Sequence, residues 1–466
     1  MRKHLAEQTV IFFSVSKWLI LSSAVGIMIG ALMSIFLRLL HSAEDSRALL
    51  PFDYYYLLPF ALMLTIWIVK TFDPSATGHG TEKVIEAVHK RDGFINVKVI
   101  PVKLVATILT IFAGGSVGKE GPGAQIGAGA ASFASTILHF SKTDRKKLVI
   151  CGISAGFASV FGTPIAGAIF GIEVLIIGVI MYDVLLPSFI AGFAAYTTAQ
   201  FLGVEYTYYD IDFFRSLNLD LMLIGQVVLA GIFFGLVSDS FITVVHKIEA
   251  FIKKIPYNAY LKAFVAGLIM VVLTILISDK YLGLGLDVIS NALRSEVVLS
   301  DSVSWYDFIL KTLFTSLSLG AGGSGGIITP VFYVGATSGV AFGHIIGDNI
   351  ALFAALGFVS VLAGTTNSPI ASIIMAVELF GTQISHYAAV SVVIAFLITG
   401  HRSVFPSQRI EKFSKAENIE IGEGIDIEHT PISVNMKDIE KIKHIRSKLR
   451  YKSLKWQVKH LKDGED

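Results

Sequence analysis

Long apolar stretches recur through the first 400 residues and constrain the possible folds more than any other feature of the sequence. Examples are NIALFAALGFVSVLAG at 349–364 and AFVAGLIMVVLTILI at 263–277. Their lengths lie around and below the roughly 20 residues that a straight transmembrane helix needs. Only 16% of the 466 residues are charged, whereas soluble globular chains carry about 25%. The pattern predicts an all-α polytopic membrane protein with many short, tilted or broken helices.

The ends of the apolar region and the charge distribution predict a topology. The first apolar block runs from about Thr9 past Leu40, which is longer than the roughly 7–15 apolar residues of a cleavable signal peptide. Basic residues cluster at 141–147 and after Arg402. The positive-inside rule places both clusters in the cytoplasm, so we expect a multi-pass protein of the cell membrane with both termini cytoplasmic. The single cysteine, Cys151, excludes an intrachain disulfide and a cysteine-based metal cluster.

The sequence also repeats itself at an offset of 205 residues, the separation of Gly26 and Gly231. In the last of three matching pairs, proline, isoleucine, alanine and glutamate all coincide. The pairs are 26–41 with 231–246, 107–110 with 312–315, and 163–174 with 368–379. We therefore predict two homologous membrane repeats, 1–205 and 206–406, followed by a hydrophilic cytoplasmic tail, 407–466.

The glycine-rich stretch GGSVGKEGPG at 114–123 superficially resembles a phosphate-binding loop. That motif needs a glycine five residues before its Gly-Lys pair and a hydroxyl after it, but the sequence has Ala113 and Glu120 at these places. A similar stretch, GAGGSGGIITP, follows at 320–330 in the second repeat. Paired breaks of this kind mark transporter binding sites, because an interrupted helix leaves unpaired N–H groups and partial positive charge at its start. Several such helix starts predict a site for a dehydrated anion, not for a nucleotide.

At this point the motifs resemble a known family. Residues 118–122, Gly-Lys-Glu-Gly-Pro, look like the G-[KR]-E-G-P signature of CLC chloride channels and proton-coupled anion exchangers. Residues 326–330, Gly-Ile-Ile-Thr-Pro, stand where that family has G-x-F-x-P, with isoleucine in the phenylalanine place. The resemblance spans roughly residues 15–410. Further matching stretches are 101–103, 125–127, 164–173 and 403–408.

The resemblance implies a CLC-type inverted repeat of many unequal, partly broken helices, working in the lipid bilayer as a homodimer with one pathway per subunit. It implies chloride or a similar small anion as the transported ligand, with no cofactor, no metal and no nucleic acid. Glu120 would be the gating glutamate, since a carboxylate at a helix N-terminus competes with an anion for the same N–H donors. The implied anion-binding residues are His79, Gly80, Lys119, Glu120, Gly121, Ile327, Ile328 and Phe405.

Two of these residues depart from the family pattern. The G-S-G-I-P motif is Gly-His-Gly-Thr-Glu at 78–82, so His79 replaces the serine whose hydroxyl donates to the anion. An imidazole can also donate, and can carry charge at acidic pH; alternatively, His79 points elsewhere and the anion contacts only backbone. We interpret Glu82 as a residue of the first helical turn, not a ligand. Phe405 replaces a tyrosine, which leaves a steric, apolar inner gate without that hydroxyl.

The sequence favours a passive channel over an exchanger. Exchangers of this family usually carry a proton-transfer glutamate directly after the residue that matches Glu173, and here that position is Val174. We interpret Glu173 and Glu378 as structural residues of their helices. The prediction is therefore transport of a small anion, chloride, through a pore gated by Glu120, with a proton-coupled antiporter as the alternative.

Other classes of protein fit less well. No serine–lysine, paired-aspartate or H-E-x-x-H arrangement supports an intramembrane enzyme. A cation transporter needs acidic or carbonyl-lined sites, and Glu120 has no partner carboxylate at 323–328. The tail of about 60 residues is too short for the paired CBS domains of many relatives, although 429–436 faintly resembles the start of one. Its basic stretch at 437–462 is either a solvated tail, which we favour, or a helix on anionic lipid.

Overall fold

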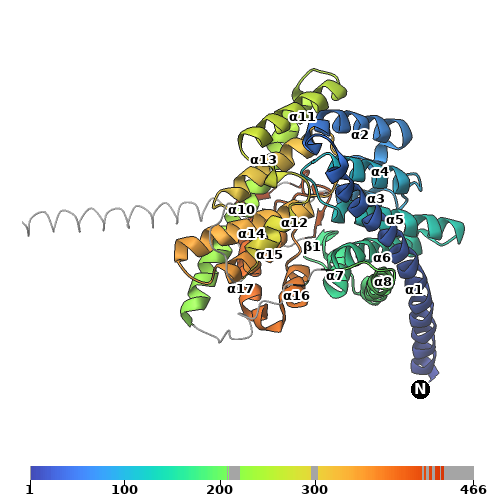
Figure 1. Cartoon of the computed structure of the whole chain (residues 1–466). Helices are drawn as coiled ribbons and strands as arrows, with labels where there is room; N and C mark the ends of the chain where they lie inside the picture. The colour runs from blue at the N-terminus through green and yellow to red at the C-terminus, as the bar shows by residue number, and fades with distance from the viewer. Residues whose placement is uncertain are drawn as a thin grey trace, which may run out of the picture.

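The fold of the chain is almost entirely helical (Figure 1). The computed structural model describes residues 2–206, 208, 221–294, 303–411, 414–415, 419–421, 426–430 and 432–434. The first group of helices is α1 (Arg2–Asp45), α2 (Leu58–Phe72), α3 (Thr81–Lys90), α4 (Val99–Phe112), α5 (Glu120–Ile137), α6 (Lys142–Phe161), α7 (Pro164–Glu173) and α8 (Tyr182–Phe201). The second group is α10 (Leu221–Lys254), α11 (Ala259–Leu276), α12 (Leu286–Ala292), α13 (Asp307–Gly320), α14 (Ile328–Ile346), α15 (Ile350–Thr366), α16 (Pro369–Phe380) and α17 (Ser385–Ile398).

Short elements connect and follow these helices. The 3₁₀ turns are η1 (Ser46–Leu49), η2 (Tyr54–Leu57), η3 (Pro74–Ala76), η4 (Asp279–Tyr281) and η5 (Thr382–Ile384). The strands are β1 (Ile176–Ile177), β2 (Arg409–Ile410), β3 (Ile419–Ile421) and β4 (Ile432–Val434). Strand β1 pairs in parallel with β2, and β3 pairs in antiparallel orientation with β4.

The helices have the unequal lengths that the sequence predicts. Among the described residues, five helices are long and apolar enough to cross a membrane: Ala6–Leu49, Tyr54–Phe72, Tyr182–Phe201, Leu221–Lys254 and Ala259–Leu276. Helix α7 has only 10 residues, so it is about 15 Å long, roughly half of the hydrocarbon thickness. Short helices of this kind must end inside the protein, where other parts of the chain satisfy their backbone groups.

Local sequence signals determine where several helices begin and end. Ser141 caps α6 by accepting the N–H of Asp144 at 3.1 Å, and Gly162 ends that helix with φ of +83°. Helices α7 and α16 both begin with proline, at Pro164 and Pro369. Proline is favoured at the first helical position because its fixed φ suits the helix and its missing N–H is not needed there.

Glycines allow the closest helix pairs to pack backbone against backbone. On α5, a Cβ added to Gly127 would lie 2.4 Å from the carbonyl oxygen of Gly152 on α6. On α14, a Cβ on Gly335 would lie 2.4 Å from the carbonyl oxygen of Gly357 on α15. Small residues at such contacts are typical of helix packing in membranes, where close approach replaces the hydrophobic driving force.

Two glutamates cap helices of the other half of the chain. The carboxylate of Glu173 accepts the N–H groups of Ile370 and Ala371, at 3.0 and 2.8 Å, at the start of α16. Glu378 accepts the two N–H groups that follow Pro164 at the start of α7, at 2.9 and 2.7 Å. A carboxylate at a helix N-terminus satisfies unpaired donors and the positive end of the helix dipole. Both glutamates therefore have a structural function, as the sequence predicts.

Two buried lysines bind carbonyl groups of the loops before α3 and α12. Lys103 on α4 is fully buried, and its Nζ donates to the carbonyl oxygens of Ala76 and Gly78 at 3.2 and 2.6 Å. Lys311 on α13 is equally buried, and its Nζ donates to the carbonyl oxygen of Gly283 at 2.9 Å. Buried ammonium groups need such partners. The hydrogen bonds of Lys103 therefore fix the loop before α3.

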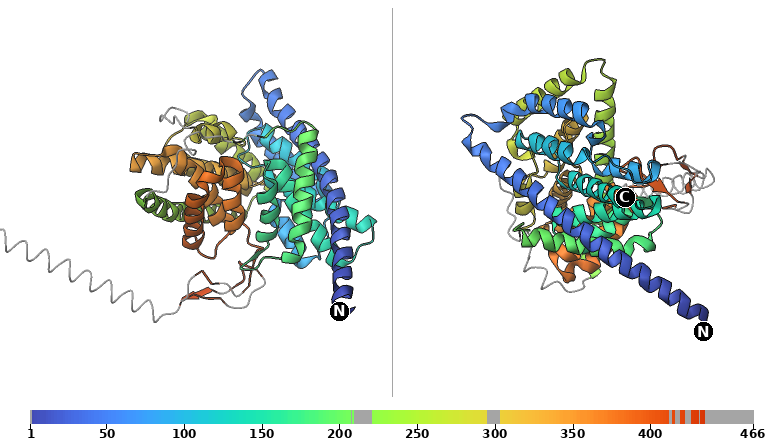
Figure 2. Two further views of the ribbon diagram at one scale, coloured as in Figure 1. Left: turned by 90° about the horizontal axis from the view of Figure 1, so that it is seen from below. Right: turned by 90° about the vertical axis from the view of Figure 1, so that its right-hand side faces the viewer.

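The described part of the tail is docked on the membrane body. The carboxylate of Asp426 lies 3.4 Å from Nζ of Lys90 on α3 and 2.5 Å from Nδ1 of His429. The N–H of Ile427 donates to the carbonyl oxygen of Gln408 at 2.8 Å. Figure 2 shows that α1 starts at the end of the molecule where β3 and β4 lie and runs to the other end. We call these ends the tail face and the opposite face. The predictions for 437–462 lie outside the described residues.

Candidate anion site

Three helix N-termini meet at the centre of the molecule: those of α3, α5 and α14. Gly80, the N-cap of α3, has φ of +79°, and a Cβ there would lie 2.4 Å from the carbonyl oxygen of Gly121. A Cβ on Gly121 would in turn lie 2.1 Å from the carbonyl oxygen of His79 and 2.9 Å from Cα of Gly326. No side chain larger than hydrogen fits at these contacts, which lets the three helix starts touch.

The loops before α5 and α14 are joined directly. Gly118 and Gly326 exchange two backbone hydrogen bonds, each 2.6 Å long, in an isolated antiparallel bridge. The N–H of Ser324 also donates to Oγ1 of Thr110 on α4 at 3.1 Å. The two glycine-rich breaks recognised in the sequence therefore lie side by side, although about 200 residues separate them.

Glu120 begins α5 and binds the start of α14. Its side chain is fully buried, and Oε2 accepts the N–H of Thr329 at 3.2 Å and its Oγ1 hydroxyl at 2.5 Å. The other oxygen, Oε1, has no hydrogen-bond partner in the described part of the chain. The carboxylate thus occupies a helix N-terminus, where unpaired N–H groups and the dipole favour an anion.

The sequence predicts Ile327 and Ile328 as anion-binding residues but gives no such role to Thr329. Ile327 is the N-cap of α14 and Ile328 its first residue, and both are buried. Thr329 follows, and supplies a hydroxyl in addition to its N–H. The threonine between Gly326 and Pro330 could have been recognised in the sequence as an anion-binding residue. A hydroxyl in the first helical turn can donate to an anion that binds there.

A cavity of about 670 Å³ leads from the opposite face to Glu120. Lys119, the N-cap of α5, lines it beside Glu120. Both signs of charge occur along its wall. The charged and tyrosine side chains that line it include Arg38, Glu44, Glu205, Tyr206 and Asp287. Glu120 therefore stands between this cavity and the helix starts.

The segment that carries Phe405 is hydrogen bonded to the helices around it. Phe405 is fully buried, and its N–H donates to Oγ of Ser403 at 3.0 Å. Glu82 lies in the first turn of α3, as the sequence predicts, and it accepts the N–H of Ser407 at 3.1 Å. Gln408 Nε2 donates to the carbonyl oxygen of the residue after α7 at 2.8 Å. These bonds fix the phenylalanine that the sequence analysis assigned to the inner gate.

His79 faces a carboxylate that the sequence analysis did not name. Its Nε2 lies 3.0 Å from Oε1 of Glu249 on α10, whereas Nδ1 is buried and has no hydrogen-bond partner among the described residues. The sequence left open whether His79 contacts the anion or points elsewhere, and the structure commits one ring nitrogen to Glu249. No sequence signal marks Glu249, because the two residues are 170 positions apart.

Val174, the position of the missing proton-transfer glutamate, is fully buried at the end of α7. Its carbonyl oxygen accepts the side chain of Gln408. The neighbouring Glu173 has both carboxylate oxygens bound to backbone N–H groups of α16. The end of α7 therefore presents no free carboxylate to the site.

Comparison with known proteins identifies the family. A family model described as "Voltage gated chloride channel" matches residues 60–400. The chain belongs to this family. The resemblance seen in its motifs is thereby confirmed. The chain is a membrane protein of a family that transports anions.

Two curated relatives of this voltage-gated chloride channel family are informative. A "Chloride/fluoride channel protein" of Pseudomonas syringae pv. tomato is 35% identical over 415 residues, which is 87% of this chain and 89% of the relative. An "H(+)/Cl(-) exchange transporter ClcA" of Yersinia pestis bv. Antiqua is 26% identical over 388 residues, which is 78% of this chain and 80% of the relative.

Solved structures of the family confirm the predicted CLC-type fold. A structure described as a CLC-type fluoride/proton antiporter has a TM-score of 0.80 and 29% identity, over 86% of this chain and 99% of its own. A slow cyanobacterial Cl⁻/H⁺ antiporter has a TM-score of 0.69 at 18% identity, over 83% of this chain and 94% of its own. The second likeness bears on the fold alone.

Proposed function

We propose that the protein is a proton-coupled antiporter of a small halide, with fluoride preferred, in which Glu120 is the gate. The observation that carries this proposal is the position of the Glu120 carboxylate, which accepts the N–H and the hydroxyl of Thr329 at the start of α14. The sequence alone favoured a passive channel for chloride because of Val174. The likeness to a fluoride/proton antiporter now favours exchange.

Coupling follows from competition for one set of donors. Ionised Glu120 uses the donors of Thr329, so an anion cannot use them at the same time. Hydrogen bonds to a charged group are worth about 1.5–3 kcal/mol each, and protonation of Glu120 removes the charge that strengthens them. The protonated side chain gives way to an anion, and the bound anion gives way when the side chain ionises. Each anion step is thereby linked to a proton step.

Two features support fluoride as the preferred anion. A relative is named for chloride and fluoride, and a similar structure is described as a fluoride/proton antiporter. The donor set around Glu120 consists of backbone N–H groups and the Thr329 hydroxyl, and a small anion with concentrated charge gains most from such donors. Phe405 in place of tyrosine leaves the dehydrated anion dependent on the N–H groups of Lys119, Ile327 and Ile328.

The proposed architecture is a homodimer in the cell membrane, with one pathway per subunit. Each subunit consists of the repeats 1–205 and 206–406. The reciprocal caps of Glu173 and Glu378 support the repeat, because each glutamate binds the helix that matches its own. The tail face is cytoplasmic in this proposal; the start of α1 and the described tail residues lie together there (Figure 2).

The reversal potential of the purified protein in a lipid bilayer tests this proposal. Equal fluoride on both sides is combined with a proton gradient. Coupled exchange predicts a reversal potential that shifts with the gradient and changes sign when the gradient is inverted. A reversal potential of zero would refute antiport and would establish the passive channel that Val174 favours. Repeating the measurement with chloride gives the anion preference.

A further inference from the structure

We infer that Glu249 and His79 form the proton-transfer pair between the tail face and Glu120, in place of the carboxylate that is missing at Val174. This inference rests on the proposed antiport, since a passive channel needs no such path. Glu249 lies near the end of α10, and His79 lies directly before the N-cap of α3. Neither residue belongs to α7, where the sequence comparison places the usual proton-transfer residue.

The pair is nearly enclosed by protein. His79 Nε2 and Glu249 Oε1 are 3.0 Å apart, with 9% and 17% of their side chains exposed. A histidine that only supports the fold satisfies both ring nitrogens when it is buried. Here Nδ1 has no partner among the residues that the structure describes. The imidazole therefore has one nitrogen on Glu249 and one free to exchange a proton.

The backbone places His79 beside the gate. Its carbonyl oxygen packs against Gly121, the residue after Glu120, so closely that a Cβ there would lie 2.1 Å away. The preceding residue, Gly78, is held by Lys103. Oε1 of Glu120 also lacks a partner within the described chain. His79 Nδ1 and Glu120 Oε1 are thus two buried polar atoms that lack a partner in the described chain, on segments whose backbones are in contact. A water molecule can bridge such groups.

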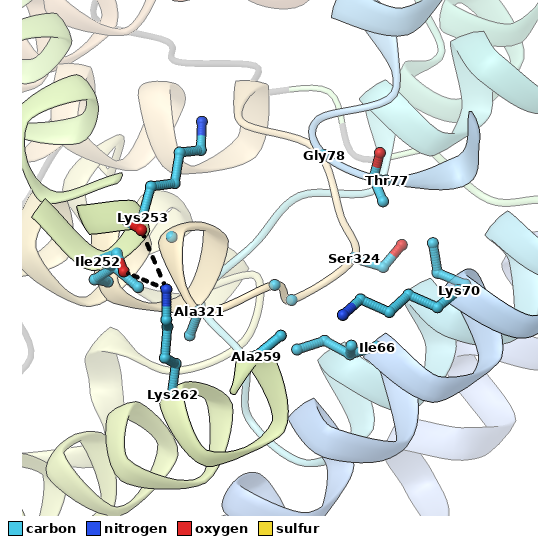
Figure 3. A pocket seen from close by; sticks show the side chains of 14 residues that line it. Ile66, Lys70, Thr77, Gly78, Ile252, Lys253, Ala259, Lys262, Ala321 and Ser324 are labelled. Carbon is cyan, nitrogen blue, oxygen red and sulfur yellow. Dashed lines mark hydrogen bonds between the residues drawn. The ribbon is translucent and has the colours of Figure 1, made fainter. Parts of the chain in front are cut away.

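A pocket of about 230 Å³ lies beside the segments that carry the pair (Figure 3). Gly78, Lys253, Gly320 and Ser324 line it. Glu249 packs behind Gly320, because a Cβ on that glycine would lie 3.4 Å from Cα and 3.6 Å from Cγ of Glu249. The pocket therefore reaches both the loop that carries His79 and the helix that carries Glu249.

The end of α10 is fixed where it borders this pocket. Lys262 Nζ donates to the carbonyl oxygens of Ile252 and Lys253 at 2.9 and 3.2 Å, as the dashed lines in Figure 3 show. Lys253 Nζ lies 3.8 Å from Oε2 of Glu249. Lys253 thus lines the pocket and also reaches the Glu249 carboxylate, which accepts the proton in this inference.

The transfer involves only O–H and N–H bonds. Protonated Glu249 donates to Nε2 of the His79 tautomer that carries its proton on Nδ1. Movement of the proton across this bond gives an imidazolium and an ionised Glu249. The imidazolium then releases its Nδ1 proton to the carboxylate of Glu120, which becomes neutral. His79 is left with its proton on Nε2, hydrogen bonded to Glu249. Water restores the first tautomer by taking up the Nε2 proton and giving a proton to Nδ1.

Other charged and titratable groups surround the pair in the described structure. His246 lies on α10 and interacts electrostatically with both members of the pair. Glu82 on α3 interacts electrostatically with His79. Arg402, which follows α17, interacts with His246 and opposes a positive charge on it. Two carboxylates, those of Glu82 and Glu249, therefore interact with the imidazole in the described structure.

The test measures fluoride efflux and proton uptake in the same suspension of proteoliposomes. Glu249→Gln keeps the shape and an acceptor for His79 but cannot carry a proton. We expect proton uptake to fall by about 100-fold, the scale of a positioned proton-transfer group, while fluoride efflux stays within the same order of magnitude. Glu86→Gln on α3 is the matched control, because in the described part of the chain Glu86 forms its salt bridge with Lys83 of the same helix, at 2.9 Å. This variant should retain wild-type proton uptake.

A second variant keeps the inference testable if Glu249→Gln does not fold. His79→Gln can still hydrogen bond to Glu249 but does not titrate, and it should lower the number of protons taken up per fluoride released. Wild-type proton uptake in a folded variant of either residue would overturn the inference and leave the proposed antiport intact. Absence of proton uptake in the wild-type protein would overturn both.

Discussion

Replacement of Glu173 by glutamine separates a helix cap from a proton-transfer residue. Glutamine keeps one carbonyl oxygen, so one of the N–H groups of Ile370 and Ala371, now bound at 3.0 and 2.8 Å, loses its acceptor. A buried donor without a partner costs about 1–3 kcal/mol. Loss of the negative charge at the start of α16 costs about 0.3–1 kcal/mol more. We expect the free energy of unfolding of Glu173→Gln to fall by about 1–4 kcal/mol.

The assay is denaturant unfolding in mixed micelles, followed by circular dichroism, beside proton uptake in proteoliposomes. The matched variant is Glu378→Gln, which removes the reciprocal cap from α7 and should destabilise the protein by a similar amount. Both variants should retain the wild-type ratio of protons to anions wherever they are folded. A Glu173→Gln protein with wild-type stability and no proton uptake would refute the assignment, and would make Glu173 the proton-transfer residue.

Three further predictions concern the gate, the helix contacts and the tail. Glu120→Gln should abolish the pH dependence of anion flux in proteoliposomes; an unchanged pH profile would exclude its gating role. Gly121→Ala should abolish folding or flux, because its Cβ would lie 2.1 Å from the carbonyl oxygen of His79. A variant that elutes from a size-exclusion column like the wild type and has wild-type flux would contradict this geometry. Burial raises the pKa of Asp426, but hydrogen bonds from His429 and Lys90 outweigh it and hold the pKa below the ordinary 3.8. Its stabilising contribution is therefore present above pH 3.8 and is lost as the pH falls through the lowered pKa, so pepsin should cleave the tail faster on acidification, and Asp426→Asn should remove this dependence.

The sequence was sufficient for the family and the helical fold. Gly-Lys-Glu-Gly-Pro at 118–122 and the break at 320–330 carry their meaning locally, because a glycine-rich interruption in an apolar region already implies a helix start inside the protein. The place of Glu82 in the first turn of α3 was also correctly predicted. These features depend on residues close together in the chain, which is where pattern reasoning is strongest.

The sequence was insufficient wherever a side chain meets a distant partner. The pairing of His79 with Glu249 spans 170 positions, and the cap of Glu173 on Ala371 spans 198. Neither partner carries a local mark, since a glutamate among lysines at the end of α10 looks like part of a solvated surface. The docking of Asp426 on α3 was missed for the same reason: a polar segment gives no sign of the surface that it covers.

The paired hydrogen bonds between Gly118 and Gly326 limit how the molecule can move. Together with the contacts of Gly80 and Gly121, they hold the starts of α3, α5 and α14 in direct contact. A rocking motion of one half of the chain against the other would break both 2.6 Å bonds at once. We therefore expect the proposed transport cycle to move side chains within a fixed frame of helix starts, and the turnover rate to depend little on how readily the surrounding lipid deforms.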